Sequence, residues 1–249
     1  FHHLKPFFHL EKTKADAIVF EEIKEDDTMK KLFFVVCVVA LAIHGIFAQG
    51  FDFVAGNKTI FNDTVQYKVG DVPSLWKVLK GTVEAQDFEG TRVITMVSRH
   101  ADMTPRFPAE FVMPDRFTLE FDVYFIKGKH SRYNVSLRDE SKKRTQEEKD
   151  LKEISIHINR ASYGSTTASV PKTSELTQGW RRISISYDKA SLKVYMDNHR
   201  LINMTDVPGT PSGLTLSVEH NQDVPSLIKN IAFKMFATNS MPTSGSMGQ

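Results

Sequence analysis

The sequence contains 249 residues, of which 32 are Lys or Arg and 30 are Asp or Glu, so its formal net charge is only +2. This balance disfavours a nucleic-acid-binding protein, which would concentrate basic charge on one face. The single cysteine, Cys37, excludes an intramolecular disulfide and a metal site built from several thiolates. The fold must therefore depend on a packed apolar core.

Residues 1–28 mix aromatic, histidine and acidic side chains without a clear period, and we interpret them as sequence upstream of the native protein. Met29 then begins a segment with the three parts of a secretory signal: a basic start, an apolar run over 32–43, and the small residue Ala48 at the expected cut site. We therefore predict a signal peptide over 29–48. The protein would then be exported, and be periplasmic, displayed at the cell surface or secreted.

A membrane anchor is the alternative interpretation of the apolar run. The run has about a dozen residues, whereas a helix needs roughly 18 to 20 apolar residues to cross a bilayer core. We therefore expect cleavage and no membrane span after it. Cys37 lies in the middle of the run and not at the cut site, which disfavours a lipid anchor.

Apolar and polar residues alternate through most of the remaining sequence, which is typical of half-buried β-strands. The clearest run covers residues 117–125. Further strands are predicted at 59–61, 81–85, 92–97, 133–137, 154–158, 183–187, 192–196, 214–218 and 231–235. About ten short strands separated by turn residues predict an all-β domain of two packed antiparallel sheets. We place this domain at 49–238 and expect a flexible tail of small residues at 239–249.

Several segments resemble known families. The segments 180–187 (WRRISISY) and 192–201 (LKVYMDNHRL) are similar to the central hairpins of laminin-G-like and concanavalin A-like jelly rolls. The segments 57–63 (NKTIFND), 69–76 (VGDVPSLW) and 117–125 (FTLEFDVYF) more closely resemble the lectin-like module that precedes the OmpA-like domain in some Bacteroidetes envelope proteins.

This likeness covers most of residues 51 to 237. It implies a two-sheet antiparallel β-sandwich of the jelly-roll, concanavalin A-like type, and a lectin-like role in the cell envelope. The sequence ends without an OmpA-like domain, so the resemblance does not imply anchoring to peptidoglycan.

A sugar-binding surface needs an aromatic platform flanked by planar polar side chains that fix the hydroxyl groups. Candidate residues of these two kinds occupy the polar phase of predicted strands, and they would form one surface if those strands share a sheet. They are Glu120, Asp122, Tyr124, Arg138, His157, Asn159 and Tyr195. A polar sheet face that binds nothing is the alternative. Trp76 and Trp180 are poorer candidates, because a Trp that opens a strand usually fills the end of the core.

Catalysis is not expected. Some concanavalin A-like glycanases carry the pattern Glu-x-Asp-x-(x)-Glu on one strand, but here Glu120 and Asp122 are followed by no second glutamate. The two carboxylates could approximate the separation that a retaining hydrolase requires, about 5 Å. The alternative is that both accept hydrogen bonds from neighbours on an exposed strand face. We therefore predict that the protein is not an enzyme.

No cofactor is predicted. The histidines show no His-Glu-x-x-His pattern, which disfavours zinc. A structural calcium ion is harder to exclude, because carboxylates from separate loops can bind it. Asp63, Asp71 and Asp87 lie near turns and are the candidates, although each would also serve as an ordinary turn or cap residue.

Residues 138–153 carry both signs of charge and only one apolar residue. We interpret this segment as a solvated excursion between two strands, with an arm that binds a partner as the alternative. Four N-glycosylation sequons begin at Asn57, Asn62, Asn134 and Asn203; they would be modified in a eukaryotic protein and be coincidental in a bacterial one.

We predict an exported, non-catalytic binding module of the cell envelope whose partner is a glycan. The alternative is a structural component whose partner is an envelope protein, and a glycan hydrolase is the least favoured of the three functions. Fold-level analogy contributes to this prediction, although one fold hosts many activities.

Overall fold

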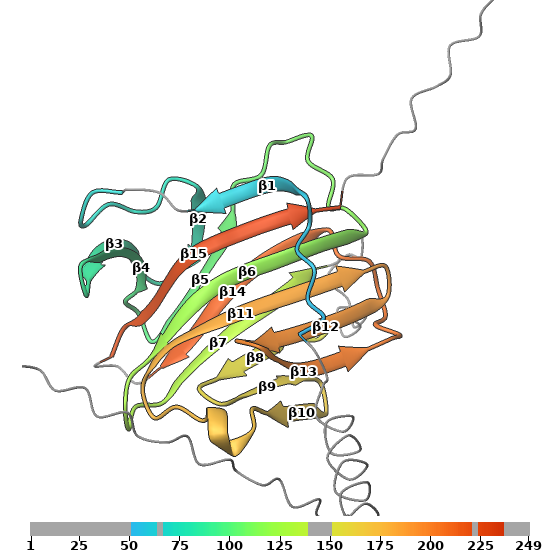
Figure 1. The fold of residues 1–249 in the computed structure, drawn as a ribbon. Helices are drawn as coiled ribbons and strands as arrows, with labels where there is room; N and C mark the ends of the chain where they lie inside the picture. Colours follow the sequence, from blue (N-terminus) through green and yellow to red (C-terminus); the bar gives the residue numbers. More distant parts are fainter. Residues whose placement is uncertain (1–50, 64–66, 139–150, 221–223, 237–249) are drawn as a thin grey trace, which may run out of the picture. The chain divides into compact units, whose positions relative to one another are not determined.

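The computed structural model describes residues 51–63, 67–138, 151–220 and 224–236. These residues form fifteen β-strands in two antiparallel sheets (Figure 1). The one helical element within them is a single 3-10 turn, η2 (Lys172–Ser174). The predicted fold class, an all-β antiparallel sandwich, is confirmed.

The first sheet has eight strands in the order β13-β12-β11-β6-β15-β4-β3, and β15 also pairs with β1. Its strands are β1 (Lys58–Asp63), β3 (Val83–Phe88), β4 (Thr91–Met96), β6 (Arg116–Phe125), β11 (Gly179–Asp188), β12 (Ser191–Met196), β13 (His199–Met204) and β15 (Ser226–Met235). Strand β4 pairs with the first part of β15 and β1 with the second part.

The second sheet has seven strands in the order β10-β9-β8-β7-β14-β5-β2. Its strands are β2 (Trp76–Lys80), β5 (His100–Pro105), β7 (Ser131–Arg138), β8 (Ile154–His157), β9 (Arg160–Tyr163), β10 (Thr166–Ser169) and β14 (Gly213–His220). The chain changes sheet at every step from β4 to β7 and again from β13 to β15. This crossing between two layers gives the jelly-roll arrangement seen in Figure 1.

The core lies between the two sheets and is built from alternate residues of their strands. Phe117, Leu119 and Phe121 of β6 and Val135 of β7 belong to one buried cluster. Burying each such side chain contributes about 1.5 to 3 kcal/mol relative to leaving it exposed. Trp76 is also fully buried, so the prediction that it fills the core is confirmed. Because successive side chains of a strand point to opposite faces, the polar phase of each strand lies on an outer face of the sandwich.

Five strands, β2, β5, β9, β10 and β13, were not predicted. Strand β5 (HADMTP) presents Ala and Pro at core positions, and β9 (RASY) and β10 (TTAS) have only four residues each. Such short or weakly apolar runs do not give a clear period of two. Pairing with neighbouring strands, and not local sequence, makes them strands.

Several predictions concern residues that the structure does not describe. These are the upstream segment 1–28, the signal peptide 29–48, residues 139–150 of the charged segment, and the tail 239–249. Within the described parts of the chain, no helix has the length and apolar character needed to span a membrane.

Candidate functional site

The seven candidate residues do not lie on one surface. Glu120, Asp122 and Tyr124 of β6, together with Tyr195 of β12, belong to the eight-stranded sheet. Arg138 is the last residue of β7 and His157 the last residue of β8, and both strands belong to the seven-stranded sheet. Asn159 lies in the turn between β8 and β9. The shared sheet that would unite the candidates is therefore not found, and their role in ligand binding stays a prediction.

On the eight-stranded sheet, the carboxylates of β6 are already engaged. Arg182 of β11 donates to Glu120 at 2.8 Å and to Asp122 at 3.0 Å. Lys234 donates to Glu120 at 3.2 Å, and Asn230 donates to Asp122 at 2.6 Å. Both carboxylates thus accept hydrogen bonds from strands on either side. This is the structural alternative that we considered for them.

Tyr195 is covered by the chain itself. Its hydroxyl donates to Asp52 at 2.9 Å, and the same carboxylate accepts hydrogen bonds from Lys193 and Arg200. The ring of Phe53 packs edge-on against Tyr195, with 5.3 Å between the centroids. The segment before β1 thus passes over this part of the sheet (Figure 1), and only 1% of Tyr195 remains exposed. Its ring is not free to stack on a sugar.

The aromatic residues at the other end of this face are packed against one another. The centroid of Tyr124 lies 4.7 Å from that of Phe88 and 5.2 Å from that of Trp180. Lys229 places its Nζ 4.0 Å from the centroid of the Trp180 ring. We expected Trp180 to fill the end of the main core. It belongs instead to this small cluster on the outer face. Lys229 occupies one face of its indole.

The outer face of the seven-stranded sheet carries adjacent polar side chains from four strands. Arg132 of β7 lies opposite Glu219 of β14, and the two form an ion pair. Asn134, two residues further along β7, lies between Ser155 of β8 and Ser217 of β14. His157 lies opposite Arg160 of β9. These planar and hydroxyl-bearing groups form a continuous polar strip across the sheet, which we call the β7 strip and define as Arg132, Asn134, Ser155, His157, Arg160, Thr215, Ser217 and Glu219.

Three polar atoms of the β7 strip are buried without a hydrogen-bond partner. They are Arg132 Nε, Asn134 Oδ1 and Thr215 Oγ1. Buried polar groups are almost always paired, and an exception is explained by a water, an ion, local strain or a functional role. Among the described residues, the outer face of the eight-stranded sheet shows no comparable atom. Unused hydrogen-bonding capacity is thus concentrated on the seven-stranded sheet.

A pocket of about 620 Å³ adjoins the β7 strip at His157. Its walls are the β6–β7 turn around Gly128, the β8–β9 turn, and the residues Ser169, Leu176 and Thr177. In the first turn Lys129 N donates to Ile126 O at 3.2 Å, and Gly128 has a φ of 69°. Glycine adopts such a left-handed conformation without steric cost, so the sequence allows this tight turn beside the pocket.

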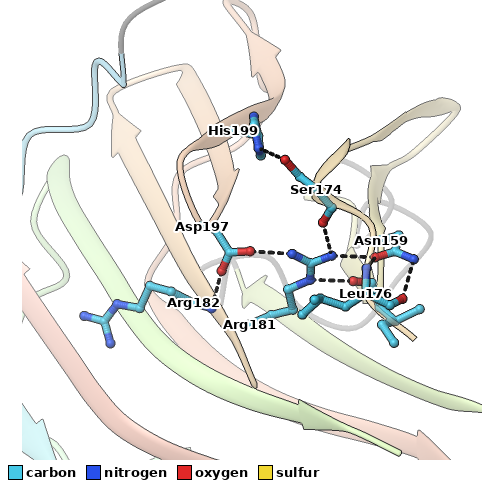
Figure 2. A network of polar contacts seen from close by, with 8 residues as sticks. Asn159, Ser174, Leu176, Arg181, Arg182, Asp197 and His199 are labelled. Atoms are coloured by element: carbon cyan, nitrogen blue, oxygen red, sulfur yellow. Dashed lines mark hydrogen bonds and ion pairs between the residues drawn. The ribbon is translucent and has the colours of Figure 1, made fainter. Parts of the chain in front are cut away.

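A buried guanidinium holds two of the pocket walls together (Figure 2). Arg181 of β11 donates through Nη2 to Asn159 Oδ1 at 2.5 Å and to Ser174 O at 2.8 Å, and through Nε to Ile158 O at 2.8 Å. A third nitrogen, Nη1, donates to Asp197 in the β12–β13 turn at 2.5 Å. These bonds tie the β8–β9 turn to the eight-stranded sheet and to η2.

Asn159 has a structural role in this network. Its side-chain amide donates to Leu176 O and its Oδ1 accepts from Leu176 N, both at 2.8 Å. Both ends of the Asn159 amide are therefore hydrogen-bonded within the protein, although the residue lines the pocket. His199 reaches the same network through Ser174 Oγ at 2.8 Å (Figure 2).

His157 is uncharged at neutral pH. Burial lowers the pKa of its imidazole to about 4, and the nearby Arg160, Arg132 and His130 act in the same direction, while Glu219 opposes them. The ring of His130 lies 6.3 Å from that of His157. A neutral imidazole has one donor and one acceptor nitrogen, so His157 can exchange hydrogen bonds with a hydroxyl group.

The aspartates that we considered for calcium have local partners. Asp63 accepts hydrogen bonds from Tyr67 at 3.0 Å and Trp76 at 2.5 Å. Asp71 accepts one from Lys68 N at 3.3 Å, and Asp87 pairs with Arg92 at 2.6 Å. Across the residues that the structure describes, no group of three or more His, Cys, Asp or Glu side chains is arranged to hold a metal ion.

Comparisons with protein-family models and with curated proteins found no match for this sequence. Solved structures give distant likenesses. The carbohydrate-binding module CBM66 from Bacillus subtilis is 13% identical, with a TM-score of 0.43 over 64% of this chain and 95% of that chain. The metal-free Emp46p carbohydrate recognition domain is 12% identical, with a TM-score of 0.46 over 66% and 90%.

The apo Crh5 transglycosylase is also 12% identical, with a TM-score of 0.46 over 76% of this chain and 91% of that chain. Binding modules and an enzyme thus appear at similar scores. Likeness at this level does not distinguish between them, and the function has to be argued from the geometry of the site.

Proposed function

We propose that the protein is an exported, non-catalytic carbohydrate-binding module and that it binds glycan on the β7 strip. The observation that carries this proposal is the row of partly exposed planar and hydroxyl-bearing groups on the strip, from Arg132, Ser155, His157 and Ser217. Beneath them, Arg132 Nε, Asn134 Oδ1 and Thr215 Oγ1 are buried without a hydrogen-bond partner in the protein. A sugar presents several hydroxyl groups, each of which donates and accepts hydrogen bonds. Planar side chains such as guanidinium, amide and imidazole hold such groups in fixed orientations.

The contrast between the two outer faces supports this choice. Glu120 and Asp122 are saturated by Arg182 and its neighbours, and Tyr195 is covered by the segment around Asp52. A glycan bound there would have to displace these internal contacts. On the β7 strip it would meet partly exposed polar groups such as those of Ser155, His157 and Ser217, and the adjoining pocket offers room beside the sheet.

The non-catalytic part of the proposal also rests on geometry. Hydrolysis of a glycosidic bond needs one protonated carboxyl group as general acid and a second carboxylate as nucleophile or base. Glu120 forms ion pairs with Arg182 and Lys234, and Asp122 forms one with Arg182. Asn230 and Lys234 also donate to these carboxylates, so both groups are held in internal contacts that a bound sugar would have to displace. Export and an envelope location belong to the proposal through the signal-like segment 29–48 and the sequence resemblance to envelope modules.

A glycan array with the purified domain 49–238 tests the proposal, followed by titration calorimetry of each ligand found. We expect binding to at least one saccharide. Arg132→Gln and His157→Ala should each weaken it about tenfold, equivalent to about 1.4 kcal/mol. Arg182→Gln and Tyr124→Phe, on the opposite face, are the matched controls and should change the affinity less than about twofold.

Two results would contradict the proposal. One is the absence of binding across the array by a domain that circular dichroism and cooperative unfolding show to be folded. The other is a loss of binding in Arg182→Gln but not in Arg132→Gln, which would place the ligand on the eight-stranded sheet.

A further inference from the structure

The pocket beside the β7 strip has a one-sided distribution of charge. Lys127 and Lys129 contribute from the β6–β7 turn, and Arg160 contributes from the start of β9, directly after the β8–β9 turn. No Asp or Glu is among the residues that line it. Three formal positive charges therefore meet around one cavity, on a protein whose whole sequence carries a net charge of only +2.

These three cations have no internal partner in the described parts of the chain, where no ion pair involves any of them. Two buried or half-buried arginines on β11 are, by contrast, held in ion pairs. Arg181 pairs with Asp197, and Arg182 pairs with both Glu120 and Asp122. The cations of the pocket are thus available to an external anion, and a concave wall strengthens their combined field.

The state of His157 is consistent with a positive local field. Arg160, Arg132 and His130 each add to the effect of burial in lowering the pKa of this imidazole, and the single opposing charge is Glu219, which is paired with Arg132. Burial is the largest cause of this lowering and disfavours charge of either sign, but the additional effect of the neighbouring cations favours the entry of a negative group.

We propose that the pocket binds the negatively charged substituent of an acidic glycan, either the carboxylate of a uronate or a sugar sulfate. This inference rests on the proposed function and specifies its ligand class. The neutral part of the saccharide would lie along the β7 strip, and the charged substituent would lie between Lys129 and Arg160. A volume of about 620 Å³ falls in the range of about 300 to 1,000 Å³ that is usual for ligand pockets.

Titration calorimetry with two matched pairs of saccharides tests this inference. The first pair is an α-1,4-linked galacturonate trimer and the corresponding galactose trimer. The second pair is 6-O-sulfated chitotriose and unmodified chitotriose. In about 50 mM NaCl we expect the charged member of at least one pair to bind about tenfold more tightly than the neutral member, and in about 500 mM NaCl most of this preference should be lost.

Two double variants test whether the preference for the charged saccharide arises in the pocket. The double variant Lys129→Gln/Arg160→Gln should reduce it to less than about twofold. The matched control Lys77→Gln/Lys80→Gln removes two charges from β2, at the far edge of the same sheet, and should leave it unchanged. A fifth titrant, sodium sulfate, separates a glycan site from a simple anion site and should bind at least about tenfold more weakly than the preferred saccharide.

The outcomes are separable. Equal binding of charged and neutral members, or a preference that survives in Lys129→Gln/Arg160→Gln, overturns the inference. It would leave the proposed function intact if Arg132→Gln still weakened binding about tenfold. Sulfate binding as strong as that of the charged saccharide also overturns the inference, and no saccharide binding at all overturns both proposals.

Discussion

Arg181 donates a hydrogen bond to Asn159 Oδ1 across 2.5 Å and thereby joins β11 to the turn that forms one wall of the pocket. Only 2% of Arg181 is exposed, and its guanidinium also reaches Ile158, Ser174 and Asp197. One buried side chain thus connects the two sheets at the end of the sandwich where the candidate site lies. The position of the site depends on this network.

We predict that Arg181→Met destabilises the fold strongly. The substitution would remove the donor to Asp197 Oδ2 and would leave the carbonyl groups of Ile158 and Ser174 without this donor. Each buried acceptor left unpaired costs about 1 to 3 kcal/mol, so we expect a total loss of about 3 kcal/mol. Urea unfolding followed by tryptophan fluorescence measures the change. Arg116→Met is the matched control, since its ion pair with Asp188 is half exposed and should contribute less than about 1 kcal/mol. Equal losses in the two variants would show that the network does not hold the fold.

We predict that His157 titrates with a midpoint near pH 4, because burial and the neighbouring cations lower the pKa of its imidazole to about 4. The unfolded chain keeps the ordinary value of about 6.5 and takes up the proton first. His157 therefore reduces stability progressively as the pH falls from about 6.5 to about 4, and has no effect on the pH dependence above that window. The imidazole carbon resonances in an NMR titration give the midpoint directly.

His157→Gln should make stability less dependent on pH between about 4 and 6.5. His100→Gln is the control, because His100 lies exposed on β5 of the same sheet. A measured midpoint near the ordinary value of about 6.5 would contradict both the burial of His157 and the effect of its neighbouring cations.

The sequence predicted the fold better than the site, for a physical reason. Strands such as β6 and β12 alternate strictly, because one of their faces packs on the core and the other does not, and this pattern is local. The assignment of a strand to one sheet or the other is not local. Tyr195 and His157 both take the polar phase of their strands, yet they lie on opposite outer faces of the sandwich, because β12 pairs with β11 and β8 with β7.

The same limit explains the residues that sequence reasoning missed. Arg132 and Asn134 take the polar phase of β7, next to the apolar positions from which that strand was predicted. Their importance comes from Glu219 and Ser217, which lie more than eighty residues away in the chain and face them in the register of β14 with β7. Pairing of residues this distant cannot be read from a single alternating run. His157 and Asn159 were both among the predicted binding residues. Asn159 holds the wall of the pocket together through Leu176, and the role of His157 in binding stays a prediction.

We predict that Asp52→Asn loosens the segment before β1 without unfolding the domain. Burial alone would raise the pKa of the Asp52 carboxyl group, but the hydrogen bonds from Tyr195 and Lys193 and the charges of Lys193 and Arg200 lower it overall. The stabilising effect of this carboxylate is therefore present at neutral pH and is lost on acidification through its lowered pKa. Limited proteolysis at neutral pH should cut the segment faster in the variant, while the global free energy of unfolding should change by less than about 1 kcal/mol. An unchanged cleavage rate would count against the described attachment.

We predict that Glu120→Gln affects stability and not a reaction. The substitution weakens contacts with Arg182 and Lys234 and should lower the free energy of unfolding by about 1 kcal/mol. Neither the native protein nor the variant should release reducing ends from a β-glucan. Release by the native protein that disappears in Glu120→Gln would identify a hydrolase on the eight-stranded sheet and refute the non-catalytic assignment.

The most direct test of the central claim is an amide chemical-shift titration of the isotope-labelled domain with the saccharide that binds best. The account predicts that the largest shift changes fall on β7, β8 and β14 and on the turns that carry Lys129 and Arg160, while amides around Trp180 and Tyr195 change little. Largest changes around Trp180 and Tyr195, with β7 unaffected, would contradict it.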